Sequence, residues 1–300
     1  MIRNFNEMLE LVKKQTGKKV IIAAAQTESA IEAAILAKRE NLADSILVGD
    51  KTGIIALLKE MAPELENAFE IIDTGSDLLA ACTTSVNLAR EGKGHVILKG
   101  KADTAVLLKT VLDKERGLRT SDLISDVLAY EHPDRVILMS DGGINLYPDL
   151  NEKVAIIKNA VAVGHALGNP SPKVALLCAV EVVNPKMPPT IDASIIVKMQ
   201  ERGQIPGCLI DGPLAFDNAI DMEAARIKNI KSSVAGDADI LIVPNIEAGN
   251  ILGKTLTYYC NYRVAHVVMG TKVPILIPSR ADTGEIKMLC MALGILASSK

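Results

Sequence analysis

Short apolar runs alternate along the chain with longer segments in which apolar residues recur at helical spacing. Most runs are rich in Val and Ile and end in Gly, Asp, Asn or Ser. This alternation is typical of strand–helix–strand units, so it predicts parallel sheets with right-handed crossovers and helices on both faces. The clearest predicted strands are KVIIAAAQ, DSILVGD, HVILKG, RVILMSD, KVALLCAV, GCLIDG, DILIVPN, HVVMG and VPILIPS.

Two stretches interrupt the alternation. Residues 114–134 (KERGLRTSDLISDVLAYEHPD) carry charged residues that break the pattern, so we predict an irregular boundary between two domains there. Residues 183–190 (VNPKMPPT) contain three of the thirteen prolines. Because proline ends any helix that begins before it, we predict a loop within the second domain at this position.

The composition agrees with helices packed on a parallel sheet. Apolar residues form 49% of the 300 residues, but aromatic residues form only 3% and Trp is absent, so the core must be built from Ala, Val, Ile and Leu. The net charge of −3 leaves no positive surplus that would attract a polyanion. We therefore expect no nucleic-acid partner.

Cysteine usage and the first residues of the chain favour a cytoplasmic location. The five cysteines are widely spaced without a C-x-x-C pair, which is typical of buried, reduced thiols. The first 19 residues are charged throughout and lack the apolar core of a signal peptide. No apolar run reaches the roughly 18 residues that a membrane span needs, so we expect no membrane partner.

Polar residues at the carboxyl ends of the predicted strands are the candidate site, because ligands of doubly wound sheets bind beyond these ends. The residues at these positions are Asp50, Lys99, Gly100, Asp141, Asp211, Gly212, Asn245, Ser279 and Arg280. Three of these strand ends carry further features.

The first strand end is LIDGPLAFDNAI, in which a strand runs into Asp211. Gly212 permits a tight turn, Pro213 limits its freedom, and Asp217 lies near the predicted start of a helix. Two interpretations stay open. The segment is either an ordinary turn between a strand and a helix, or a rigid wall of a substrate pocket.

The second strand end is ADILIVPNIEAGNILGKTLTYY, in which Ala248, Gly253, Lys254 and Thr255 match the relaxed consensus sequence of a phosphate loop. A phosphate loop needs small residues so that backbone N–H groups can turn inward. The bulky pair at 251–252 instead favours the first turn of a helix that also contains Lys254 and Thr255. The N-terminus of such a helix could still attract an anion.

The third strand end is VPILIPSRADTGEIKMLCMALGIL. A strand is predicted to end at Ser279 and Arg280, and a helix to begin near Asp282 or Thr283 with Glu285 in its first turn. Helix capping explains the acidic residues and the threonine. It does not need Arg280, whose guanidinium beside a helix N-terminus suits a phosphate group, with the Ser279 hydroxyl within reach.

Metal-ion and serine-hydrolase chemistry find no support in the sequence. The four histidines show no metal-ligand spacing, so we expect no metal site. The chain also lacks a G-x-S-x-G motif.

DGPLAFDNA, PNIEAGNILGK and PSRADT together resemble the phosphate acetyl/butyryltransferase family, and most closely its phosphate butyryltransferase branch. ILKGKADTAVLL and RVILMSDGGINLYPDL also look like family segments and follow in the expected order, so the resemblance covers essentially the whole chain. It implies that Gly249 and Asn250 belong to a family loop and that the following Gly-Lys-Thr is incidental.

The resemblance implies a fold of two doubly wound α/β domains that flank a cleft, similar to isocitrate and isopropylmalate dehydrogenases. We expect residues 1–126 to form the first domain and residues 127–269 the second. Residues 270–300 are expected to supply a strand and a helix that return to the first domain. We also expect a homo-oligomer.

The resemblance implies the reversible reaction of acyl-CoA and phosphate to acyl phosphate and CoA, with butyryl-CoA as the expected substrate and no tightly bound cofactor. Ser279 and Arg280 match the family's pair, in which Arg binds phosphate and Ser polarises the reacting centre. A catalytic Asp follows that Arg by six positions in the family's acetyltransferases, but Ile286 stands there in this chain. Glu285 and Asp282 both stay open as the base. The expected substrate-binding residues are Asp211, Gly212, Pro213, Asn245, Gly249, Asn250 and Thr283.

Four other functions compete with this interpretation. A phosphate acetyltransferase would share the chemistry but prefer acetyl-CoA. A protein that binds CoA esters without catalysis would fit the absent Asp. An ATPase or kinase would use the Ala248–Thr255 segment, and a decarboxylating dehydrogenase would need a metal-binding cluster of aspartates.

Overall fold

The computed structural model describes residues 1–120 and 123–298, and the chain divides into two compact units. The first unit consists of Phe5–Asp122 and Val264–Lys300, and the second of Met1–Asn4 and Leu123–Arg263. From Phe5 onward, the chain thus builds most of the first unit, forms the second, and returns to the first for its last segment.

The first unit is built on a sheet with the strand order β3-β2-β1-β4-β11-β10. All neighbours in it are parallel except β10 and β11, which are antiparallel. The strands are β1 (Lys19–Ala23), β2 (Asp44–Gly49), β3 (Glu70–Asp73), β4 (Val96–Lys99), β10 (Val264–Met269) and β11 (Ile275–Leu276).

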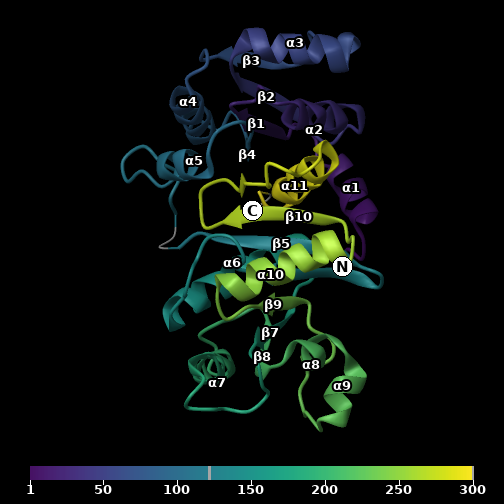
Figure 1. Cartoon of the computed structure of the whole chain (residues 1–300), viewed down its shortest axis with the longest axis vertical. Coiled ribbons are helices and arrows are strands. Elements are labelled where there is room, and N and C mark those ends of the chain that lie inside the picture. The colour runs from purple at the N-terminus through teal and green to yellow at the C-terminus, as the bar shows by residue number, and fades with distance from the viewer. Residues whose placement is uncertain (121–122, 299–300) are drawn as a thin grey trace. The chain divides into compact units, whose positions relative to one another are not determined.

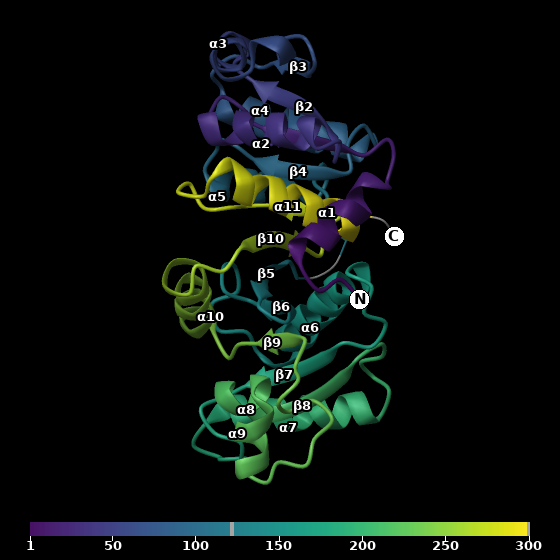
Figure 2. The same ribbon diagram turned by 90° about the vertical axis from the view of Figure 1, so that its right-hand side faces the viewer.

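Helices cover both faces of this sheet. Figures 1 and 2 show α2 and α11 side by side on one face and α4 and α5 on the other. The helices are α1 (Phe5–Lys13), α2 (Glu28–Arg39), α3 (Lys51–Met61), α4 (Leu78–Arg90), α5 (Thr104–Val111) and α11 (Gly284–Ala297), with a short 3₁₀ turn at Pro63–Leu65.

The C-terminal helix α11 forms part of the core of the first unit. Its sequence GEIKMLCMALGILA is apolar on nearly every side, and every residue from Lys287 to Ala297 is buried. The helix packs against α2 and β10. A helix that is apolar all round must be buried all round, which explains why it lies between a sheet and another helix.

The second unit has the strand order β5-β6-β9-β7-β8. β5 and β6 form an antiparallel hairpin, and the remaining neighbours are parallel. The strands are β5 (Ser125–His132), β6 (Arg135–Ser140), β7 (Lys173–Leu177), β8 (Leu209–Leu214) and β9 (Ile240–Ile242). The helices are α6 (Leu150–Ala166), α7 (Pro188–Glu201), α8 (Phe216–Ile220), α9 (Met222–Ile227) and α10 (Ile246–Lys254), and a π-helical turn at Thr255–Tyr259 follows α10.

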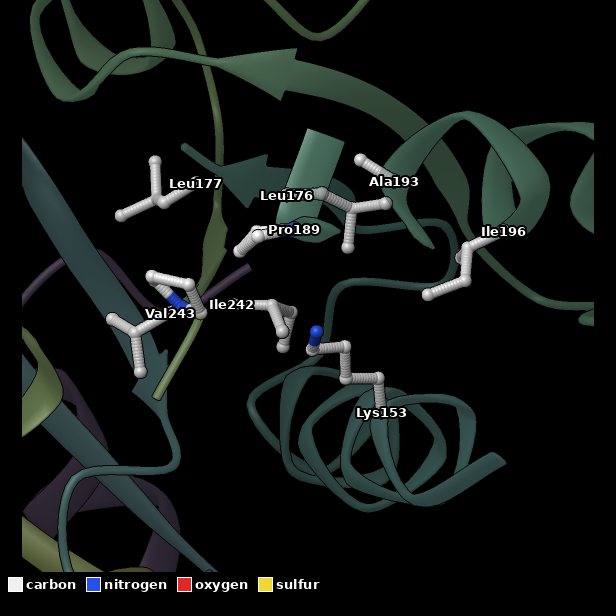
Figure 3. Close-up of a pocket in the computed structure, with 9 residues that line it drawn as sticks. Lys153, Leu176, Leu177, Pro189, Ala193, Ile196, Ile242 and Val243 are labelled. Atoms are coloured by element: carbon white, nitrogen blue, oxygen red, sulfur yellow. The ribbon is translucent and has the colours of Figure 1, made fainter. Parts of the chain in front are cut away.

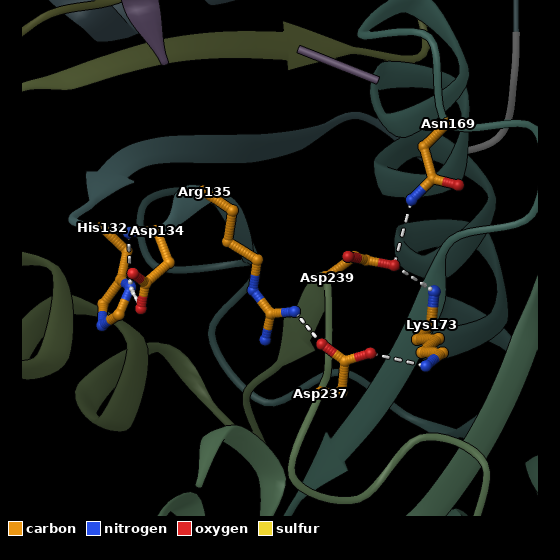
Figure 4. Close-up of polar contacts among 7 residues, drawn as sticks. All are labelled: His132, Asp134, Arg135, Asn169, Lys173, Asp237 and Asp239. Atoms are coloured by element: carbon orange, nitrogen blue, oxygen red, sulfur yellow. Dashed lines mark hydrogen bonds and ion pairs between the residues drawn. The ribbon is translucent and has the colours of Figure 1, made fainter. Parts of the chain in front are cut away.

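Polar contacts hold together the amino ends of three strands in the second unit (Figure 4). Asp237 pairs with Arg135 at the start of β6 and accepts from Lys173 at the start of β7 at 2.6 Å. Asp239 accepts from the backbone N–H of Lys173 at 2.9 Å and from Asn169 at 3.0 Å. These contacts align the strand starts, and the chemistry is expected at the opposite, carboxyl edge.

All nine predicted strands are confirmed, but two further strands were missed. β5 lies inside residues 114–134, which the sequence predicts to be irregular and of which 121–122 lie outside the described residues. Its charged residues occupy partly exposed positions, while the apolar stretch at 127–130 is buried. β3 is an edge strand with no fully buried residue, so it lacks a strong apolar run.

Two other expectations need correction. The sheets are mixed instead of purely parallel, because the short turns that join β5 to β6 and β10 to β11 permit only antiparallel neighbours. The predicted loop at 183–190 is partly helical, since Pro188 and Pro189 open α7. Proline is tolerated in the first turn because its missing N–H would have no helical partner there.

The five cysteines are free thiols, of which Cys82, Cys208 and Cys290 are buried. Cys178 is half-buried and Cys260 is exposed, so the expectation that the cysteines are buried is wrong for Cys260. Among the described residues, none of the helices combines the length and the apolar character that a membrane span requires.

Candidate active site

The segment between β11 and α11 holds the Ser-Arg pair in the first unit. Thr283 caps α11, because its side-chain oxygen accepts from the N–H of Ile286 at 3.3 Å, and Glu285 lies in the first turn, as predicted. Asp282 is buried, and its carboxylate accepts from the N–H of Ser279 at 2.7 Å. Asp282 therefore fixes the backbone that presents Ser279 and Arg280.

Arg280 forms an ion pair but stays accessible to solvent. Its guanidinium pairs with the carboxylate of Asp103, yet the side chain is 77% exposed. Asp103 lies just before α5, beyond the end of β4, and β4 pairs in parallel with β11. The two residues therefore meet at the carboxyl ends of adjacent strands, and guanidinium donors remain accessible for an anion.

Two buried lysines add positive charge at this edge. Lys99 is the last residue of β4 and is 4% exposed. Burial lowers the pKa of Lys99, and the charges of Arg280 and Lys287 lower it further. Burial also lowers the pKa of Lys287, whose ammonium donates to the backbone oxygen of Asp282 at 2.5 Å. The sequence places Lys99 among the candidate residues at strand ends but assigns it no specific role.

In the second unit, Asp141 organises the loop that follows β6. Its buried carboxylate accepts from the N–H groups of Gly143 at 2.8 Å and Ile144 at 3.1 Å, and from the side chain of Asn145 at 2.6 Å. Burial and the charge of Asp126 raise the pKa of Asp141 to about 6. With so many donors around it, Asp141 holds the loop in one conformation.

The start of α10 packs on this loop. Asn245 caps the helix by accepting from the N–H of Ala248 at 3.0 Å, and Asn250 donates to the backbone oxygen of Gly142 at 3.3 Å. A Cβ atom on Gly249 would lie 2.7 Å from the Cα of Gly142, so only glycine permits this approach.

The segment from Ala248 to Thr255, which matches the phosphate-loop consensus, does not form a phosphate-binding loop. Residues 249–252 lie inside α10 and Lys254 ends it, which confirms the predicted helix. The helix begins at Ile246, however, so residues 251–252 lie beyond its first turn, and Thr255 follows in a π-helical turn. The first turn also has few free donors, because the N–H of Ile246 is taken by the backbone oxygen of Leu146 and that of Ala248 by Asn245. The expectation that this N-terminus attracts an anion therefore gains no support from its hydrogen bonds.

Asp211, Gly212 and Pro213 lie within β8, so the turn expected at these three residues is wrong. Asp217 lies in the first turn of α8, as expected. The carboxylate of Asp211 accepts from the N–H of Gly212 at 2.8 Å. A Cβ atom on Gly212 would lie 2.7 Å from the Cβ of Leu176, so this part of β8 packs tightly on its neighbour β7.

An apolar pocket adjoins this part of β8 (Figure 3). Lys153 enters it from α6, and its ammonium pairs with Asp192 at 2.6 Å. The free volume is about 10 Å³, room for one water molecule. The other lining residues are Leu176, Leu177, Pro189, Ala193, Ile196, Ile242, Val243 and Pro244.

The structure thus brings the predicted residues together in three groups. Ser279, Arg280, Asp282, Thr283 and Glu285 share one loop and helix start, with Lys99 and Asp103 beside them. Asn245, Gly249 and Asn250 share the start of α10. Asp211, Gly212 and Pro213 share β8. Within residues 1–120 and 123–298, no group of three or more His, Cys, Asp or Glu side chains is placed to hold a metal ion.

Comparisons with known proteins agree with one another. Residues 77–295 match the family model described as "Phosphate acetyl/butaryl transferase". The chain is 44% identical to a phosphate butyryltransferase of Clostridium acetobutylicum, with 99% of each chain covered. It is 42% identical to a phosphate acetyltransferase of Thermotoga maritima, with 96% of this chain and 98% of that one covered.

Among solved structures, a branched-chain phosphotransacylase from Enterococcus faecalis V583 superposes on the chain with a TM-score of 0.83 at 29% identity. The match covers 94% of this chain and 99% of that structure.

Proposed function

The chain belongs to the phosphate acetyl/butyryl transferase family, and from this membership we propose that it catalyses the reversible conversion of acyl-CoA and phosphate to acyl phosphate and CoA. Butyryl-CoA is the proposed substrate. The observation that carries the proposal is the 44% identity to a phosphate butyryltransferase along 99% of both chains. The 42% identity to a phosphate acetyltransferase makes acetyl-CoA the alternative substrate.

Family membership excludes the kinase or ATPase function that the phosphate-loop consensus suggested. The geometry agrees, because the segment from Ala248 to Lys254 is a helix and Thr255 follows directly in a π-helical turn. A nucleotide-binding loop would need backbone N–H groups that turn inward around phosphates.

We propose that Arg280 binds the phosphate group and that Ser279 donates to the carbonyl oxygen of the reacting acyl group. In the direction from acyl-CoA, a phosphate oxygen attacks the thioester carbon, the new carbon–oxygen bond forms, and the carbon–sulfur bond breaks. The oxygen that becomes negative in the tetrahedral intermediate needs a nearby donor, which Ser279 supplies. The guanidinium fork supplies parallel donors for phosphate oxygens.

The departing CoA thiolate takes up a proton, and in the reverse direction the thiol must lose it. We propose Glu285 as the group that exchanges this proton. Its side chain is exposed in the first turn of α11, whereas the carboxylate of Asp282 is buried and engaged by the N–H of Ser279. Asp282 is accordingly proposed as a positioning residue.

We also propose the residues that bind the rest of the substrate. Asp211, Gly212 and Pro213 are proposed to form a rigid wall, which their tight packing on β7 supports. Asn245, Gly249, Asn250 and Thr283 complete the proposed set. CoA acts as substrate, and no tightly bound cofactor is proposed.

The proposed architecture is a pair of domains that flank a cleft, as in isocitrate and isopropylmalate dehydrogenases. Residues 1–126 with 270–300 are the proposed first domain, and residues 127–269 the second. The two compact units divide after Asp122 and Arg263, close to these boundaries, with residues 264–269 in the first unit. A homo-oligomer in the cytoplasm is the proposed state.

The test is the release of free CoA thiol from butyryl-CoA and acetyl-CoA, each with and without phosphate. We expect release only with phosphate and faster release from butyryl-CoA. Faster release from acetyl-CoA would assign the chain to the acetyltransferases. If neither ester releases CoA in a phosphate-dependent manner, the proposed enzyme activity is overturned. That result would favour a protein that binds CoA esters without catalysis.

A further inference from the structure

Within the described residues, the buried ammonium of Lys99 forms no ion pair with a carboxylate. Three lysines among the described residues are buried, namely Lys99, Lys153 and Lys287. Lys153 pairs with a carboxylate at 2.6 Å, and Lys287 donates to a backbone oxygen at 2.5 Å. In the described part of the chain, Lys99 makes one side-chain hydrogen bond, to the backbone oxygen of Gly100 at 3.5 Å, which is a marginal distance for such a bond.

The backbone holds Lys99 in this place. β4 lies between β1 and β11, and just past its end Gly100 donates to the backbone oxygen of Ala23 at 2.8 Å. The next residue, Lys101, donates to the oxygen of Ala24 at 2.7 Å. A Cβ atom on Gly100 would lie 2.2 Å from that same oxygen of Ala24, so the two backbone segments approach as closely as glycine permits. Lys99 therefore stays with its strand end.

The charges around Lys99 leave an excess of positive charge. Burial lowers the pKa of its ammonium, and the two neighbouring cations, Arg280 and Lys287, lower it further. Asp103 acts in the opposite direction, but its carboxylate already pairs with Arg280. A buried ion is costly unless an opposite charge compensates it, and an anion at this strand end would do so.

We propose, on the basis of the function proposed above, that Lys99 is a further binding residue for the phosphate group, to which its ammonium donates a hydrogen bond while Arg280 binds another oxygen. Phosphate is a compact dianion, and a lysine and an arginine together match its charge. Lysine binds phosphate as a point charge, and arginine binds it through a planar fork. The two residues therefore do not duplicate each other.

The test compares Lys99→Met with Lys109→Met, which removes an exposed lysine from the last turn of α5. Lys99→Met is expected to raise KM for phosphate about tenfold or more, because a hydrogen bond from a charged group is lost, and to change KM for butyryl-CoA little. Lys99→Arg should recover part of the affinity, and Lys109→Met should behave as the unaltered protein. A Lys99→Met protein with an unchanged KM for phosphate would overturn the proposal.

Phosphate binding can also be measured without turnover. A ligand that binds the folded state raises the melting temperature, so phosphate should stabilise the unaltered protein and Lys109→Met, and stabilise Lys99→Met clearly less. If Lys99→Met does not fold, Lys99→Gln takes its place. Equal stabilisation of all variants would overturn the role of Lys99, whereas failure of the proposed enzyme would appear separately, as absence of CoA release from the unaltered protein.

Discussion

At the scale of single residues, Arg280 carries the first prediction. Its guanidinium pairs with Asp103, yet the side chain is 77% exposed, so a phosphate can reach it. We expect Arg280→Ala to lower kcat/KM for phosphate on the order of a hundredfold, and Arg280→Lys to lower it less, because lysine keeps the charge but loses the fork. Steady-state kinetics measures both, with Arg226→Ala, an exposed arginine of α9, as the control. A folded Arg280→Ala enzyme with normal kinetics would place phosphate elsewhere.

Substitution of Glu285 and of Asp282, the two acidic candidates for proton exchange, should affect different properties of the protein. Glu285→Gln is expected to lower kcat more than it changes KM, because a proton-exchanging group acts mainly in the transition state. Asp282→Ala removes the acceptor of the Ser279 N–H, so we expect a loss of stability of about 1–3 kcal/mol. Kinetics and urea unfolding distinguish the two. Normal turnover of Glu285→Gln would exclude Glu285 as the exchanging group.

Asp141 predicts how stability depends on pH. Burial and the charge of Asp126 raise its pKa to about 6, above the ordinary 3.8, so the folded state holds the proton more tightly than the unfolded chain. Its contribution to stability is therefore greatest below about pH 4, falls as the pH rises to about 6, and is constant above. The stability difference between the unaltered protein and Asp141→Asn, from urea unfolding, should shrink across this window. If the unfolding free energies of the two proteins change in parallel with pH, the raised pKa of Asp141 is contradicted.

At the scale of elements, the contact between α10 and the loop after β6 depends on glycine. Alanine normally stabilises a helix interior relative to glycine, but a Cβ atom on Gly249 would lie 2.7 Å from the Cα of Gly142 and 2.8 Å from the oxygen of Asp141. We expect Gly249→Ala to lower the free energy of unfolding by about 1–3 kcal/mol, because the backbone must shift.

Gly253→Ala is the matched control on the same helix. A Cβ atom there would lie 3.3 Å from the ends of two side chains, Leu128 and Met139, which can move. In urea unfolding, the free energy of unfolding of this variant should be close to or above that of the unaltered protein. If both variants had the same stability, the close approach of the two backbones would not be the cause.

At the scale of the whole molecule, we predict that catalysis does not depend on a divalent ion. The described residues contain no group of three or more His, Cys, Asp or Glu placed to hold a metal ion, and arginine and lysine provide the positive charge for phosphate. CoA release from butyryl-CoA with phosphate should therefore persist in EDTA. Complete loss of release that one divalent ion restores would contradict the proposed mechanism.

The course of the whole chain depends on contacts that local patterns do not report. The return of the chain after residue 263 places β10, β11 and α11 in the first unit. Resemblance to the family implied the return of residues 270–300, with one strand and one helix, but β10 falls within the residues that were expected in the second domain. Periodicity alone shows only further strands and a helix. The start of the second unit lies within the predicted boundary region, yet that region also contains β5. Charged residues there suggested a linker, but they lie at the strand's partly exposed positions.

The sequence by itself determined the nine apolar strands, the helix at the phosphate-loop consensus, the helix start near Asp282 or Thr283 and the family, because these depend on residues close together in the chain or on whole-length similarity. The tertiary structure decided which strand ends lie side by side. Asp103 and Arg280 are 177 residues apart, and they meet because β4 and β11 pair in parallel. Hydrogen bonds between distant strands leave no periodicity in the sequence, and for this reason the burial of Lys99 and its place beside Arg280 are seen only in the folded chain.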